Sequence, residues 1–117
     1  MVVRRGQIWW ADLGESRGSS PGYERPVIVV QSNSFNNTKI ESIIVAIVTT
    51  NLRLADMPGN IRLTKEVSGL DKESVVNITQ LFTVDRKDCI QLIGILPNKK
   101  IEQINQGLSL VLSLQLK

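Results

Sequence analysis

Residues 24–26 place a carboxylate, a guanidinium and a proline directly before an apolar run, within the stretch SSPGYERPVIVVQS (residues 19–32). A charge beside a buried strand is costly to desolvate, and a proline, which lacks a backbone N–H, belongs at the start or edge of a strand. Glu24, Arg25 and Pro26 therefore have two interpretations. Either they mark the boundary between a turn and a strand, or they hold Arg25 rigidly at the rim of a site.

The composition narrows the chemistry that this chain can use. It has no histidine, which removes the commonest general base and the commonest metal ligand. Its one cysteine, Cys89, cannot form an internal disulfide and has no histidine to activate it, so a small packed hydrophobic residue is the best interpretation. We therefore expect no metal site and no cofactor. Catalysis would have to rely on Arg, Lys, Asp, Glu, Ser, Thr or Tyr.

Length and charge favour one small domain with a mildly basic surface. The 117 residues predict a single domain over 1–117, and 14 Lys and Arg against 11 Asp and Glu give a net charge of +3. This charge permits a polyanionic partner such as nucleic acid without requiring one. No apolar run approaches the roughly 18 residues of a membrane span, and the N-terminus lacks the features of a signal peptide. We expect a cytoplasmic protein with no membrane association.

Most of the chain carries the pattern of short strands. These are predicted at residues 7–13, 26–31, 42–49, 61–63, 74–83 and 90–95. In the first strand Ile8 and Trp10 would lie on one face, with Trp9 and Ala11 on the other. Residues 14–24 and 50–60 form long loops rich in turn-forming residues, and 32–41 is polar with room for one helical turn.

The last segment changes to a helical period. From Pro97 onward, an apolar residue recurs at 3.6-residue spacing, at Ile101, Ile104, Leu108, Val111 and Leu112. Gly107 within this helix suggests a close packing contact. The predicted fold class is mainly β with a C-terminal helix, as an antiparallel, strongly bent sheet or small barrel. The apolar helix either packs within the chain or faces a second subunit.

Several segments together resemble the MazF/PemK family, the toxins of bacterial toxin–antitoxin pairs. They are, in chain order, RGQIWWADL (5–13), RGSSPGYERPVIVVQ (17–31), IVAIVT (44–49), GLDKESVV (69–76), QLFTVD (80–85) and IGIL (93–96). The resemblance covers nearly the whole chain. It implies a small Src-homology-3-like barrel, a homodimer, and metal-independent cleavage of single-stranded RNA. It also implies a cognate antitoxin that blocks the site.

The resemblance assigns two catalytic residues, Arg25 and Thr49, with Thr50 as the alternative if the match slips by one residue. In such a reaction the 2′-hydroxyl of RNA attacks the adjacent phosphorus. Arg25 would stabilise the charged phosphorane through parallel hydrogen bonds, and Thr49 would donate its hydroxyl to the same phosphate. Glu24 is a candidate acid or base, although a solvated partner of Arg25 is an alternative role.

The chain departs from the usual family pattern at Ser20, Thr79 and Phe82, where many members carry a glutamate, an acid and an arginine. These departures leave the general base unassigned. Candidate substrate-binding residues are Ser19, Ser20, Tyr23 and Gln80. Gln80 would read a base edge or serve as a hydrogen-bonded core residue.

Aromatic residues offer further contacts for single-stranded RNA. Tyr23 and Phe35 lie in predicted loops and are candidates for base stacking, whereas Trp9 and Trp10 are better explained by packing. Two alternatives to the nuclease stay open from the sequence. One is a toxin of the same broad fold that binds DNA gyrase, and the other is a non-catalytic RNA-binding barrel.

Overall fold

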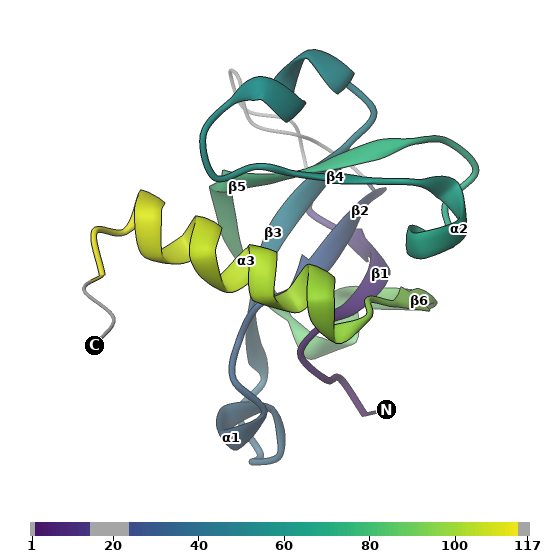
Figure 1. The fold of residues 1–117 in the computed structure, drawn as a ribbon. Helices are drawn as coiled ribbons and strands as arrows, with labels where there is room; N and C mark the ends of the chain where they lie inside the picture. Colours follow the sequence, from purple (N-terminus) through teal and green to yellow (C-terminus); the bar gives the residue numbers. More distant parts are fainter. Residues whose placement is uncertain (1, 15–23, 115–117) are drawn as a thin grey trace.

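The computed structural model describes residues 2–14 and 24–114. In this part of the chain, six antiparallel strands curl into a half-barrel, and a helix crosses one side of it (Figure 1). The strands are β1 (Gln7–Asp12), β2 (Glu24–Val29), β3 (Ser42–Thr49), β4 (Ile61–Leu63), β5 (Ser74–Asp85) and β6 (Cys89–Ile95). Their order in the sheet is β4-β5-β3-β2-β1-β6. The prediction of a mainly β fold with a C-terminal helix is confirmed.

Short helical segments occupy the connections between strands. They are α1 (Asn33–Asn36), the 3-10 turns η1 (Leu52–Asp56) and η2 (Arg86–Asp88), and α2 (Lys65–Ser68), followed by the long α3 (Asn98–Val111). Helix α2 was not predicted. The hydroxyl of Thr64 caps its start, and Gly69 ends it in the left-handed conformation at φ 81°. No helix in the described residues is long and apolar enough to cross a membrane.

The start of β2 differs from the prediction. The strand begins at Glu24, so Pro26 lies within it rather than at its first residue. Pro26 pairs with Trp10 of β1, whereas the pairing of β2 with β3 begins only at Val27, opposite Ile47. The missing N–H of proline thus coincides with the end of the β2–β3 ladder, which explains why proline is tolerated in an inner strand.

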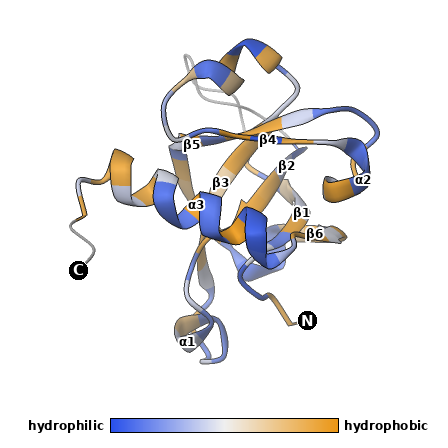
Figure 2. Cartoon of the chain, in the orientation of Figure 1, coloured by the Kyte–Doolittle hydropathy of each residue, from blue (hydrophilic) through white to orange (hydrophobic). Residues whose placement is uncertain are grey.

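Alternation along the strands divides the apolar residues into two clusters. The side covered by α3, called here the helix side, buries Ile8, Ile28, Ala46, Val48, Val76, Ile78 and Ile104, among others. The opposite side, called here the far side, buries Trp9, Ala11, Val27, Val29, Val45, Ile47 and Val84, among others. The predicted two faces of the first strand are therefore confirmed. Orange hydrophobic residues run along β2 and β3, and α3 alternates between orange and blue (Figure 2).

Helix α3 packs very closely on the loop before β4. A Cβ on Gly107 would collide with the backbone oxygen of Gly59, so the predicted close contact at Gly107 is confirmed. Ile101, Leu108 and Val111 pack against the helix-side cluster as predicted. Leu112 does not: it is 50% exposed, because the helix ends one residue earlier, at Val111.

Strand β5 contains a pronounced bulge. Leu81 lies opposite Ala46 of β3, but the next residue of β3, Ile47, lies opposite Asn77. Residues 78–80 therefore have no partner on β3, and β5 bends at this point. The bulge changes the setting of Gln80, which the sequence places in the middle of a regular strand.

Candidate active site

The far side of the sheet carries Arg25 and Thr49 at the same end of neighbouring strands. Val27 and Val29 pair with Ile47 and Val45, and the β2–β3 pairing ends at Val27 and Ile47, so Arg25 and Thr49 each lie two residues past this last pair. Arg25 pairs with Ala11 of β1, and Thr49 pairs with Val75 of β5. Residues directly opposite each other in a sheet share a face. Arg25 follows the alternation of Val27, and Thr49 follows that of Ile47, so the sheet places both on the far side, at the same end of neighbouring strands.

The backbone around Thr49 orients its hydroxyl group. Thr49 is half-buried, and its Oγ1 accepts a hydrogen bond from the backbone N–H of Asn51 at 3.2 Å. The hydroxyl hydrogen can then be donated outward, to an anionic oxygen. Thr50 is exposed and alternates to the other side of the strand. Alternation thus places Thr49 on the side of Arg25, whereas Thr50 lines a hollow that Arg25 also lines.

Arg25 and Glu24 lie on different sides of β2. Arg25 follows the alternation of Val27 and Val29, whereas Glu24 follows Pro26 and Ile28 of the helix side. Glu24 is exposed, and its strand partner is Asp12. Among residues 2–14 and 24–114, no hydrogen bond or ion pair holds the guanidinium of Arg25. The strand geometry thus does not pair Glu24 with Arg25.

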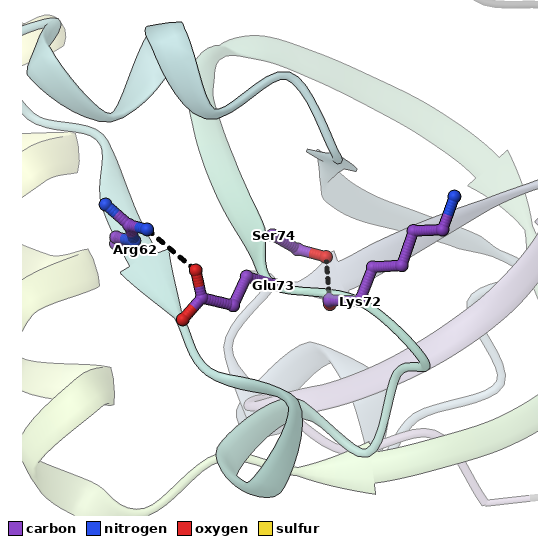
Figure 3. Close-up of polar contacts among 4 residues, drawn as sticks. All are labelled: Arg62, Lys72, Glu73 and Ser74. Atoms are coloured by element: carbon purple, nitrogen blue, oxygen red, sulfur yellow. Dashed lines mark hydrogen bonds and ion pairs between the residues drawn. The ribbon is translucent and has the colours of Figure 1, made fainter.

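A hollow of about 370 Å³ adjoins the ends of β1, β2 and β3. Its lining is Trp10, Glu24, Arg25, Pro26, Val48, Thr50, Leu70, Asp71, Lys72 and Ser74. The hydroxyl of Ser74 donates to the carbonyl oxygen of Lys72 at 3.0 Å, and the Lys72 side chain extends away from it (Figure 3). Arg25 lies at the boundary between this hollow and the far side.

Gln80 is held by neighbouring amides rather than by the apolar core. Its Oε1 accepts a hydrogen bond from Nδ2 of Asn77 at 2.9 Å, and Oδ1 of Asn77 accepts one from Nδ2 of Asn60 at 3.3 Å. Asn77 lies opposite Ile47 on the far side, two positions along the strand from the partner of Thr49. Gln80 is thus tied to the same face as Thr49. Ser19, Ser20 and Tyr23 lie outside the described residues.

Sequence reasoning missed Asn60 and Asn77. The available signal was an asparagine within an otherwise apolar strand, because strands disfavour asparagine unless its amide is hydrogen-bonded. The candidate stacking residue Phe35 lies away from the site. Phe35 is exposed on α1, at the opposite end of β3 from Thr49 (Figure 1).

The two tryptophans and the cysteine have structural surroundings. Trp9 is 6% exposed and donates its indole N–H to Oε1 of Gln7 at 2.9 Å, so it packs in the core as the sequence favours. Trp10 is half-buried in the lining of the hollow. Cys89 is buried in the far-side cluster, and burial raises the pKa of its thiol. No three His, Cys, Asp or Glu side chains within the described residues form a group that could hold a metal ion.

Comparison with known proteins identifies the family of this chain. Residues 4–112 match the family described as the PemK-like, MazF-like toxin of type II toxin-antitoxin systems. The chain is 40% identical over 114 residues to Endoribonuclease MazF6 of Mycobacterium tuberculosis, covering 97% of this chain and 100% of that protein. It is 32% identical to Endoribonuclease MazF of Staphylococcus saprophyticus, over 97% of this chain and 93% of that protein.

Solved structures share the fold at lower identity. An endoribonuclease from a mycobacterial species aligns with a TM-score of 0.80 at 20% identity, covering 100% of this chain and 97% of that one. An endoribonuclease in complex with its cognate antitoxin, also mycobacterial, aligns with a TM-score of 0.77 at 20% identity, covering 98% and 99%. Fold and family match together define the class, a toxin of a type II toxin–antitoxin system. The chain belongs to the PemK-like, MazF-like toxin family.

Proposed function

We propose that this protein is a sequence-specific endoribonuclease toxin that cleaves single-stranded mRNA without a metal ion. The observation that carries the proposal is the 40% identity to Endoribonuclease MazF6 over 97% of this chain. The placement of Arg25 and Thr49 at the same end of neighbouring strands β2 and β3 supports it, because both side chains suit a phosphate. No comparable observation favours binding to gyrase or RNA binding without cleavage.

The proposed reaction begins with attack of the 2′-hydroxyl on the adjacent phosphorus. The P–O5′ bond breaks, which gives a 2′,3′-cyclic phosphate (or a 3′-phosphate after hydrolysis) and a 5′-hydroxyl. The guanidinium of Arg25 would donate two parallel hydrogen bonds to the phosphorane oxygens, where negative charge develops. Thr49 would donate its hydroxyl to the same phosphate, oriented by the N–H of Asn51.

Proton transfer is not assigned to a residue in this proposal. Glu24 was the candidate acid or base, but its position on the opposite side of β2 from Arg25 argues against it. An arginine with its usual pKa above about 12 is a poor proton shuttle. Removal of the Glu24 carboxylate is therefore expected to change the cleavage rate less than removal of Arg25.

We also propose that the protein acts as a homodimer and that a cognate antitoxin neutralises it. Apolar side chains on edge strand β6 and at the end of α3 support a protein interface: Ile90 is 53% exposed, Ile95 64%, Leu110 59% and Leu114 52%. A dimer or antitoxin interface that covers these side chains would remove them from water. The solved complex of a mycobacterial endoribonuclease with its antitoxin supports the second partner.

An RNA cleavage assay in EDTA tests the function. Wild type, Arg25→Ala and Thr49→Ala are each incubated with a long single-stranded RNA, and the 5′ ends of the products are mapped. Discrete cuts by wild type that both variants lose are the expected result. Intact RNA in the presence of folded protein would contradict the nuclease proposal, and a gyrase-dependent growth defect would then favour the alternative. Cuts that require added Mg²⁺ would contradict metal independence.

A further inference from the structure

Three amide side chains form a continuous chain from the loop before β4 to the bulge of β5. Asn60, Asn77 and Gln80, called here the amide triad, connect the end of residues 50–60 with the far side of the sheet. Asn77 and Gln80 are half-buried, so water competes only partly for these groups. Each amide has a donor end and an acceptor end, so the orientation of one amide in the triad determines the orientation of the next.

Backbone groups fix that orientation at Asn60. Its Oδ1 accepts the N–H of Ile78 at 2.9 Å, and its Nδ2 donates to the carbonyl oxygen of Leu54, also at 2.9 Å. A backbone N–H can only donate and a carbonyl oxygen can only accept, so the reverse orientation of Asn60 would lose both bonds. Nδ2 must therefore face Asn77, which in turn must present an acceptor to it.

The same reasoning then sets Asn77 and Gln80. Oδ1 of Asn77 accepts from Asn60 at 3.3 Å and from the hydroxyl of Thr79 at 3.3 Å, which leaves Nδ2 to donate to Gln80 at 2.9 Å. Oε1 of Gln80 accepts that hydrogen bond. Its Nε2, which carries two N–H donors, is the end turned away from the triad, and no acceptor in the described residues binds it. Gln80 thus presents a donor.

We propose that Asn77 is a specificity-determining positioning residue that makes Gln80 a hydrogen-bond donor to a keto base, uracil or guanine. This inference rests on the proposed function. Asn77 and Thr49 are diagonal neighbours across β3 and β5, a relation that sets side chains about 7–8 Å apart. Gln80 is bonded to Asn77, so we place the base of a nucleotide whose phosphate contacts Thr49 beside Gln80.

The chemistry of the base edges gives the selectivity. Guanine O6 and the O4 of thymine, which uracil shares, are acceptors, whereas adenine N6 and cytosine N4 are donors. Two donors facing each other leave both unsatisfied, so an amino base at this position is disfavoured. The amide triad would therefore select a keto base over an amino base at one position of the cleavage motif.

Substitution of Asn77 by aspartate tests the transmission of orientation. A carboxylate can accept from Asn60 and Thr79 but cannot donate, so the Gln80 amide must turn its Nε2 toward residue 77 and present Oε1 to the RNA. Asn77→Asp is expected to reverse the preference at one motif position from keto to amino bases, by about 10-fold. Gln80→Glu should act in the same direction, and Asn77→Leu should abolish the preference without reversing it.

Base preference is read as a ratio within each protein, from cleavage-site mapping on a randomised RNA pool. A uniform effect of added negative charge cancels in that ratio. Thr79→Val is the matched control, because it removes one hydrogen bond to Asn77 but leaves the orientation of the amides, and its motif should equal that of wild type. Thermal unfolding of each variant checks that the protein is folded.

A second measurement separates this inference from the nuclease proposal. Binding of Arg25→Ala, with and without Asn77→Asp, is measured on short RNAs that differ only in one base. If wild type fails to cleave RNA, the nuclease proposal fails, and the keto preference is still read from binding. A motif that Asn77→Asp leaves unchanged, or a loss of rate that is equal for all four bases, overturns the role given to Asn77.

Discussion

Alternate residues of the same strands form the two sides of the sheet, yet the two sides differ in what borders their apolar clusters. On the helix side, α3 covers the apolar cluster. It packs so closely on the loop before β4 that a Cβ on Gly107 would collide with the backbone of Gly59. On the far side, the apolar cluster ends in a polar row at one end of β2 and β3, where Arg25 and Thr49 lie. Both sides bury an apolar cluster; the helix side is covered by α3, and the far side leads to Arg25 and Thr49 at one end.

This difference between the two sides explains the order of Glu24, Arg25 and Pro26 along β2. A shift of one residue in a strand exchanges its faces. Arg25 must occupy an odd position of β2 to share the side of Val27, and Pro26 then occupies the position where the β2–β3 ladder ends. Glu24 is the first residue of β2, so the stretch does mark the start of a strand, and the role of Arg25 at the rim of a site stays a prediction.

The largest expected effect is loss of catalysis on removal of Arg25. Arg25→Ala should reduce the rate of RNA cleavage about 100- to 1000-fold, because it deletes a donor aimed at charge that develops on the phosphorane. Arg62→Ala is the matched control, since it removes the same charge from an exposed side chain on β4. Initial rates on one RNA oligonucleotide measure both. Equal losses in the two variants would show that net charge matters rather than the far side.

The next effect separates two adjacent threonines. Thr49→Val keeps the shape of the side chain and deletes the hydroxyl, so cleavage should fall about 10- to 100-fold, as for a lost hydrogen bond to a charged group. Thr50→Val makes the same change on the opposite side of the strand and should stay near the wild-type rate. Single-turnover cleavage rates give the comparison. A larger loss at Thr50 would mean that the hollow, not the far side, holds the scissile phosphate.

The sequence predicts the sheet and its faces well, because short-range patterns determine them. Alternation in residues 7–13 places Trp9 and Ala11 together, and the 3.6-residue period places Ile101, Ile104 and Leu108 on the core. The assignment of Arg25 and Thr49 to one site came only from the family resemblance. No local pattern states which strands become neighbours.

What the sequence could not predict depends on long-range geometry. The bulge at residues 78–80 arises from the register of β5 on β3, and it ties Gln80 to Asn77 and, through it, to Asn60. Helix α2 has only four residues, too few for a periodic signal, and its capping residues Thr64 and Gly69 were the available clue. Glu24 was a candidate because it adjoins Arg25 in sequence, but neighbours in a strand point to opposite sides.

A change on the helix side should alter stability and leave the cleavage chemistry intact. Gly107→Ala is expected to lower the free energy of unfolding by about 1–3 kcal/mol, because the new methyl group meets the backbone oxygen of Gly59 rather than a movable side chain. Helix propensity alone predicts the opposite, a gain of about 1 kcal/mol. Urea unfolding decides between them.

The control for that substitution lies one residue earlier in α3. Gln106 is exposed, so Gln106→Ala should change the free energy of unfolding very little. Below the unfolding transition, the folded fraction of Gly107→Ala should cleave RNA with the wild-type motif. An altered motif would show that a change in α3 affects the far side, which would contradict the separate roles given to the two sides.

The smallest effect is expected at the exposed ion pair between Arg62 and Glu73, which joins β4 to the start of β5 (Figure 3). The two groups are 2.7 Å apart, and the hydrogen bond that Arg62 donates to the Glu73 carboxylate raises the pKa of Arg62. Their side chains are 55% and 42% exposed, so water and salt screen the attraction. Glu73→Gln should leave the urea midpoint within error at both low and high salt. A clear loss at low salt that disappears at high salt would instead show that this pair anchors the three-residue strand β4, and with it the Asn60 end of the amide triad.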